Sequence, residues 1–245
     1  MTGIIASNRI NEKGNRGIFD QAKVMVLRAV PDGDEYDKDI ALAIRYAADN
    51  GAKVINTSFG KGFSPHKEWV WDALKYAEEK DVLIVNAAGN SGANVDPGNK
   101  KTYITDEVNG KEIVSNFINV GAINNSFNKD QVASFSNFGS VNVDVFAPGS
   151  NIWSSIPNEK HEFYSGTSMA APNASGVAAA IRSFFPKLKA YQVKRILMDS
   201  GVPLNPMLEK PKTGELVNPK TLSRSGKAVN LYNALIYCSN KSYKK

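Results

Sequence analysis

The chain has 245 residues, of which 42% are hydrophobic and 22% charged, with 19 glycines and 11 prolines. This is the composition of an ordinary globular protein with a sizeable core, and it excludes a disordered, collagenous or coiled-coil chain. The net charge of +6 comes from residues 201–245, which hold 8 basic and 2 acidic residues, whereas residues 1–200 hold 22 of each. Because these lysines are dispersed, we expect a solvated basic tail at about 239–245 and no nucleic-acid partner.

The sequence lacks the patterns that mark a membrane span, a disulfide framework or a zinc site. No apolar run approaches the length of about 18 residues that spans a bilayer, and the chain does not open with a basic and then apolar signal segment. The single cysteine, Cys238, allows no internal disulfide, and the histidines His66 and His161 are widely separated. We therefore expect no membrane span and no metal site.

The first half of the chain alternates short apolar runs with amphipathic segments, which is typical of a parallel sheet covered by helices. Its predicted elements are a buried strand at Val24–Val30, a helix at 37–50, a strand at 53–57, a helix that opens at Ser64-Pro65 and a strand at 82–86. Right-handed crossovers would place Thr57-Ser58 and Asn86-Ala87 side by side at the carboxyl edge of the sheet, where ligands bind in such folds.

The second half continues the same pattern. Residues 91–112 are polar and rich in turn residues, which predicts a surface loop. The elements predicted after it are strands at 117–123 and 143–146 and helices at 168–185 and 190–199. Since no repeat or linker interrupts the chain, we expect a single α/β domain over residues 1–245, with helices on both faces of a mostly parallel sheet.

The segment Gly166-Thr167-Ser168 stands where the long small-residue helix begins. Free backbone N–H groups and the positive end of the helix dipole converge at such a point, which suits a hydroxyl that attacks a carbonyl and the oxyanion that then forms. A plain Ser/Thr helix cap would show the same local pattern.

Two strand ends carry the other candidate residues. Ala88-Gly89-Asn90 follows a buried strand, and the Asn90 amide could donate into a site, although Gly-Asn-Ser-Gly is also a common turn. Ser58-Phe59-Gly60 follows another strand, where exposed backbone could pair with an extended peptide.

Together these segments resemble the subtilisin-like serine protease family (subtilases, peptidase S8). The run GTSMAAP at 166–172 resembles the family's nucleophile motif over its whole length, Ala87–Asn90 its oxyanion segment and Ser58–Gly60 its substrate-binding strand. Two connecting segments, ASFSNFG at 133–139 and FAPG at 146–149, match in the right order. The resemblance covers about residues 1–200 and 226–235.

The resemblance implies a three-layer α/β/α fold and a serine endopeptidase. It assigns Ser168 as the nucleophile, Asn90 as the oxyanion donor, and five residues as the lining of the substrate cleft: Ser58, Phe59, Gly60, Ala88 and Gly89. It also implies polypeptide substrates, a monomer, a secreted or cell-envelope location and no cofactor for the chemistry. Family members often bind calcium, but the acidic run Asp32–Asp39 fits no twelve-residue calcium loop, so a solvated helix cap is favoured there.

One departure from the family concerns the catalytic base. The family order is Asp, His and then Ser, with the histidine in a His-Gly-Thr-His segment, and neither His66 nor His161 lies in such a segment. Met1–Ala6 resembles the stretch that follows this histidine. We therefore expect an N-terminally truncated peptidase domain that lacks the aspartate strand and the histidine segment and is weakly active or inactive. The alternatives are a non-catalytic peptide-binding domain and an incomplete gene product without independent function.

Overall fold

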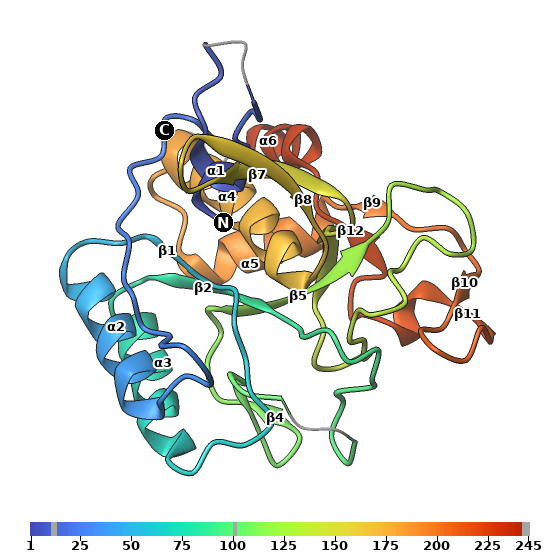
Figure 1. Cartoon of the computed structure of the whole chain (residues 1–245), viewed down its shortest axis with the longest axis horizontal. Coiled ribbons are helices and arrows are strands. Elements are labelled where there is room, and N and C mark those ends of the chain that lie inside the picture. Colours follow the sequence, from blue (N-terminus) through green and yellow to red (C-terminus); the bar gives the residue numbers. More distant parts are fainter. Residues whose placement is uncertain (11–13, 100–101, 242–245) are drawn as a thin grey trace.

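Parallel strands with helices on both sides form the body of the protein (Figure 1). The computed structural model describes residues 1–10, 14–99 and 102–241. The helices are α1 (Thr2–Ala6), α2 (Asp37–Asp49), α3 (Lys67–Glu79), α4 (Thr167–Phe184), α5 (Ala190–Asp199) and α6 (Leu231–Asn240), with a 3₁₀ turn η1 (Pro219–Thr221). The strands are β1 (Val54–Thr57), β2 (Leu83–Ala87), β3 (Glu107–Val108), β4 (Lys111–Glu112), β5 (Phe117–Ile123), β6 (Val145–Pro148), β7 (Ile152–Ile156), β8 (Lys160–Tyr164), β9 (Val202–Pro203), β10 (Leu208–Glu209), β11 (Leu216–Val217) and β12 (Lys227–Ala228).

Six of the described strands make the central sheet, in the order β1-β2-β5-β6-β12-β9. The pairs from β1 to β12 are parallel, and β9 is antiparallel to β12. The remaining described strands form three separate antiparallel pairs, β3 with β4, β7 with β8 and β10 with β11. The ends of β1 and β2 therefore lie at one edge of the sheet, because Thr57 is in register with Asn86.

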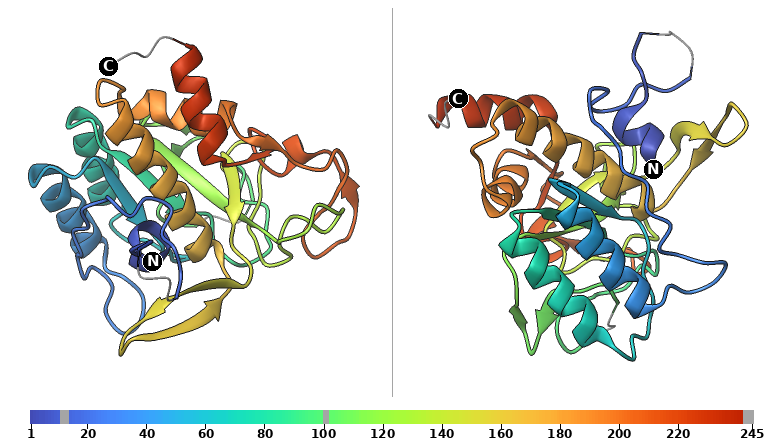
Figure 2. Two further views of the ribbon diagram at one scale, coloured as in Figure 1. Left: turned by 90° about the horizontal axis from the view of Figure 1, so that it is seen from above. Right: turned by 90° about the vertical axis from the view of Figure 1, so that its left-hand side faces the viewer.

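Alternating side chains of the sheet contribute to the two largest hydrophobic cores of the described residues, one on each face. Leu83 and Val85 of β2 belong to the cluster formed with α4, α5 and α6, whereas Ile84 belongs to the cluster formed with α2 and α3. This alternation follows from the two-residue period of a strand, and it covers both faces of the sheet with helices. Figure 2 shows the resulting layers from two further sides.

Most of the predicted elements are present. β5 and α5 have the predicted bounds, α2 ends one residue early at Asp49, and α4 is shifted by one residue to 167–184. The surface segment 91–112 also contains the short pair β3 and β4, which the turn-rich composition did not indicate. The three-layer fold with a mostly parallel sheet is confirmed.

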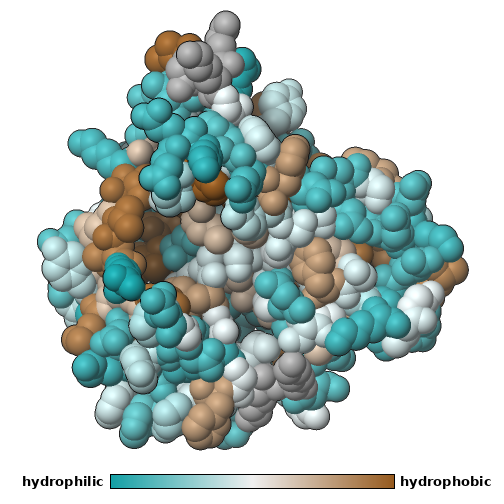
Figure 3. All heavy atoms as spheres, in the orientation of Figure 1, coloured by the Kyte–Doolittle hydropathy of each residue, from teal (hydrophilic) through white to brown (hydrophobic). Residues whose placement is uncertain are grey.

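The prediction of a buried strand at Val24–Val30 is wrong. This segment forms no strand, and its apolar side chains are exposed, at 43% for Val24, 42% for Met25 and 77% for Val26. A strand needs a hydrogen-bonding neighbour, and β1, the outer strand of the described sheet, pairs with β2 alone. In Figure 3, the hydropathy-coloured surface shows apolar residues around a hollow on the left of this face.

Two further expectations concern the basic tail at about 239–245 and the lack of a membrane span. Residues 239 and 240 are the last of α6, and residues 242–245 of the predicted basic tail lie outside the described residues. Among the helices that the structure describes, none has the length and apolar character needed to cross a membrane.

Candidate active site

Ser168 lies in the first turn of α4 and contacts the predicted substrate-binding segment directly. Its Oγ donates a hydrogen bond of 3.1 Å to the carbonyl of Ser58, and the Ser58 Oγ donates one of 2.9 Å to the carbonyl of Ser168. Asn56 Nδ2 in turn donates to the Ser58 Oγ at 2.9 Å. The fold thus joins two of the predicted site segments, which are 110 residues apart in the sequence.

A proline in α4 leaves the backbone carbonyl of Ser168 without its usual hydrogen-bond donor within the helix. In a regular helix this oxygen would accept a hydrogen bond from the N–H four residues later, but that residue is Pro172, which has none. The Ser58 hydroxyl takes the place of the missing donor. The proline of the GTSMAAP run therefore ties the start of α4 to the end of β1.

Asn90 is held beside Ser168 with its amide oriented. Its Oδ1 accepts hydrogen bonds from the backbone N–H and the Oγ1 of Thr167, at 2.8 and 2.9 Å. The oxygen is therefore engaged, and the Nδ2 group of this exposed side chain remains as the donor. The Ser168 N–H has no hydrogen-bond partner among the described residues. Asn90 Nδ2 and this N–H are therefore two neighbouring donors that a ligand could engage.

The strand end that carries Asn90 is shaped by two residues that the sequence analysis did not single out. Thr167 is fully buried, and its Oγ1 also accepts from the Gly89 N–H at 3.1 Å. Asn137 is fully buried too, and it donates to the Ala88 carbonyl at 2.8 Å while accepting from the N–H groups that follow Asn90. Gly89 has a φ of 100°, and a Cβ there would overlap the Asn137 amide. Both residues stand in motifs quoted above, but their roles depend on contacts between distant segments.

Ser58–Gly60 presents open backbone beside Ser168. Within the described part of the chain, neither the N–H nor the carbonyl of Phe59 or Gly60 pairs with a neighbouring segment. The next residue, Lys61, exchanges two backbone hydrogen bonds with Tyr103, at 2.8 and 2.9 Å. This is the arrangement that an added extended peptide requires, namely a fixed edge with unpaired polar groups.

Neither histidine is brought to Ser168. The exposed ring of His66 stacks on Trp69, with centroids 4.2 Å apart, and its Nδ1 lies 3.6 Å from Glu68. His161, on β8, stacks on Trp153 at 5.6 Å. No imidazole therefore shares a hydrogen bond with the Ser168 Oγ in the described residues, and the hydroxyl proton is directed to the Ser58 carbonyl.

The acidic run at 32–39 is not a simple solvated cap. Glu35 and Asp37 are each only 4% exposed, and Asp37 forms an ion pair with Lys61 at 2.8 Å. An ammonium group thus already holds the Asp37 carboxylate. No group of three or more His, Cys, Asp or Glu side chains arranged to hold a metal occurs in residues 1–10, 14–99 and 102–241.

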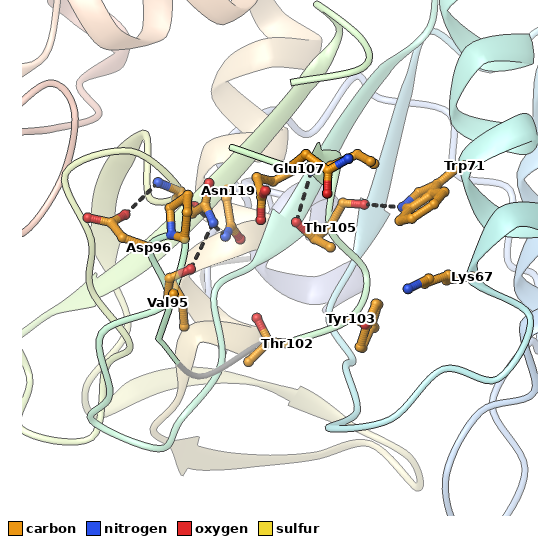
Figure 4. A pocket seen from close by; sticks show the side chains of 14 residues that line it. Lys67, Trp71, Val95, Asp96, Thr102, Tyr103, Thr105, Glu107 and Asn119 are labelled. Atoms are coloured by element: carbon orange, nitrogen blue, oxygen red, sulfur yellow. Dashed lines mark hydrogen bonds between the residues drawn. The ribbon is translucent and has the colours of Figure 1, made fainter. Parts of the chain in front are cut away.

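A cavity of about 100 Å³ opens beside the site but does not contain it (Figure 4). Its wall includes Thr102 and Tyr103 on one side and Trp71 on the other, where the indole N–H donates to the Thr105 carbonyl at 3.1 Å. Ser168, which is half-buried, and Asn90, which is exposed, lie outside it. The cavity adjoins the site through Tyr103, which pairs with Lys61.

Comparisons with known proteins agree with this geometry. A model of the subtilase family, peptidase S8, matches residues 1–226. The chain is 39% identical to a thermophilic serine proteinase of Bacillus sp. (strain AK1) over 75% of this chain and 41% of that protein. It is also 39% identical to a cell wall-associated protease of Bacillus subtilis (strain 168), over 80% of this chain and 20% of that one. It thus spans less than half of either relative.

Among solved structures, the chain superposes on a protease from Pseudoalteromonas arctica PAMC 21717. The TM-score is 0.76 at 25% sequence identity, and the match covers 96% of this chain and 68% of the other. The similarity in fold therefore extends over almost the whole chain.

Proposed function

The chain belongs to the subtilase family, and we propose that it is the nucleophile-bearing part of a serine endopeptidase with Ser168 as the attacking residue. The observation that carries the proposal is the joint placement of the Ser168 hydroxyl, the Asn90 amide and the open backbone of Ser58–Gly60. Polypeptides are the proposed substrates, and no cofactor takes part.

The proposed reaction is acyl transfer through Ser168. A base takes the proton of the Ser168 hydroxyl while Oγ attacks the scissile carbonyl carbon, and Asn90 Nδ2 and the Ser168 N–H hold the resulting oxyanion. The C–N bond then breaks, and the departing amine receives the proton from the base. Water attacks the acyl-enzyme in the same way and releases the second product.

The base is proposed to come from outside the described residues. The support is that His66 and His161 are each engaged on other side chains, and that α1 (Thr2–Ala6), which resembles the stretch after the family's histidine, packs beside α4. A segment that precedes Met1 in a longer protein would then supply the imidazole and its aspartate. Without them, the Ser168 hydroxyl is a poor nucleophile, because its pKa stays far above neutrality.

Labelling of Ser168 by a fluorophosphonate tests this proposal. The isolated chain should label slowly or not at all, and addition of a fragment with the aspartate strand and the His-Gly-Thr-His segment should accelerate labelling. The Ser168→Ala variant is the control and should not label under either condition. Rapid stoichiometric labelling of the isolated chain would refute the external base, and His66→Ala and His161→Ala would then show which imidazole serves.

A second candidate is a peptide-binding domain without catalysis, which is favoured by the hydrogen bond that directs the Ser168 hydroxyl to the Ser58 carbonyl. This function predicts that an uncharged, N-acetylated peptide amide binds the chain as tightly as the same peptide carrying a C-terminal boronic acid. A peptidase predicts that the boronic acid binds more tightly once the fragment with the aspartate strand and the His-Gly-Thr-His segment is added, since it then forms a tetrahedral adduct with Ser168.

We also propose a monomer in a secreted or cell-envelope location. The cell wall-associated relative supports this location. Fractionation of the producing cells would decide it.

A further inference from the structure

Lys61 is a buried lysine immediately after the open segment Ser58–Gly60. Its side chain is 5% exposed, and its Nζ lies 2.8 Å from Oδ1 of Asp37, whose side chain is 2% exposed. The same Nζ donates a hydrogen bond of 2.6 Å to the carbonyl of Glu35. Lysine is rarely buried unless it is paired, and both the burial and the pairing of Lys61 indicate a structural role.

The partner carboxylate is fully engaged and charged. Asp37 accepts hydrogen bonds from the Ser64 Oγ at 2.6 Å and from the His66 N–H at 2.9 Å. Burial by itself would raise the pKa of Asp37, but the hydrogen bonds from Lys61, Ser64 and His66, with the Lys61 charge, outweigh it and hold the pKa below its ordinary value. The pair is therefore an ion pair at neutral pH.

The backbone of Lys61 fixes a second contact. It pairs with Tyr103 through two hydrogen bonds, and a Cβ on Gly60 would lie 2.9 Å from the Tyr103 carbonyl. Lys61 thus joins three segments: the loop before α2, the end of the Ser58–Gly60 segment and the wall of the cavity at Tyr103. Phe59 and Gly60 themselves have no backbone partner among the described residues.

We propose that Lys61 and Asp37 are positioning residues that hold Ser58–Gly60 in the conformation that pairs with a bound peptide. The proposal rests on the proposed function, since it assigns the substrate's place to this segment. A buried ion pair is often no more stabilising than an apolar pair of the same size, but it fixes geometry. A fixed edge lowers the entropy lost when an extended peptide binds, because the backbone is already ordered.

The decisive variant removes both charges together, so that neither is left buried without its partner. Lys61→Met with Asp37→Asn keeps the volume of both side chains and abolishes the ion pair, and Lys61→Arg keeps the positive charge as the conservative rescue. The matched control is Lys194→Met with Glu112→Gln, which likewise removes both charges of a pair and leaves Asp144 beside Arg224. Lys194 is another buried lysine, 2.8 Å from Glu112, on α5, which carries none of the proposed site residues.

Two measurements are made on the full chain. Binding of an N-acetylated hexapeptide boronic acid ending in phenylalanine reports the site, and hydrogen exchange reports the backbone amides of Lys61 and Tyr103, which are hydrogen-bonded to each other's carbonyls. We expect the double variant to bind at least tenfold more weakly and these two amides to exchange at least tenfold faster. Lys61→Arg should stay within about threefold of the parent, and the Lys194→Met, Glu112→Gln control should change neither quantity.

The outcomes separate the two proposals. If the parent chain binds no peptide, the proposed function fails. If the parent binds and the double variant binds equally well, the positioning role is overturned and the proposed function stands. If Lys194→Met with Glu112→Gln weakens peptide binding as much as the Lys61→Met, Asp37→Asn variant does, the effect is one of general stability, and the positioning role is again overturned.

Discussion

Asp106 is predicted to make the stability of this protein fall as the pH rises. Its carboxyl is 8% exposed, and its Oδ2 has no hydrogen-bond partner in the described part of the chain. Burial raises its pKa to about 7; the charge of Lys194 opposes the shift, while Glu112 and Asp144 add to it. The carboxyl belongs to the segment between β2 and β5 that also lines the cavity beside the site.

The size and sign of the effect follow from the two pKa values. The folded state keeps the Asp106 proton up to about pH 7, whereas the unfolded chain releases it near the ordinary value of 3.8. Raising the pH from about 4 to about 7 therefore favours the unfolded state, and the loss levels off above pH 7. The difference between the pKa values corresponds to about 4 kcal/mol in total, of which about 3 kcal/mol falls between pH 5 and pH 8.

Replacement of Asp106 by asparagine removes this penalty while keeping the shape of the side chain. Urea unfolding at pH 5 and pH 8 should show Asp106→Asn gaining about 3 kcal/mol relative to the parent between the two values. Asp72→Asn, at an exposed carboxyl on α3, is the control and should show no such change. If the free-energy difference between Asp106→Asn and the parent is the same at pH 5 and pH 8, the folded-state pKa is not raised and the reasoning is wrong.

If the proposed function holds, Asn90→Ala in the chain completed by the missing segments should lower kcat by about 10²–10³ with little change in KM. This is the loss of kcat found when such a donor is removed from subtilisin itself. An effect on KM alone would make Asn90 a binding residue. The small wall at Ala88-Gly89 and the apolar Phe59 predict cleavage after large apolar or aromatic residues, and a peptide library that instead showed a dominant preference for Lys or Arg would contradict this. Burial raises the pKa of the Cys238 thiol to about 11, so iodoacetamide at pH 8 should modify it in urea but not in the folded chain, and fast modification without urea would show an open α6.

The elements with a clear hydrophobic periodicity could be predicted from the sequence, because that periodicity depends only on the residues of the element itself. β5 is an apolar run interrupted only by Asn119 and buried along its whole length, and α5 carries its apolar residues on one side, so both were predicted with their bounds. The family could be recognised from GTSMAAP at 166–172 because all of the residues of this motif are contiguous. By contrast, Val24–Val30 has the composition of a strand, yet composition does not provide the neighbour that a strand must pair with.

The tertiary structure decided which side chains act together. Thr167 orients the amide of Asn90 from 77 residues away, and Ser58 supplies the donor that Pro172 cannot give to the Ser168 carbonyl. Lys61 has nothing in its local sequence that indicates burial, because a lysine is expected in solvent until a buried carboxylate is placed against it. Such contacts depend on how the strands and helices cross in space, and the packing of the two cores sets these crossings. The sequence by itself determined the helices and strands and the reactive side chains that they carry.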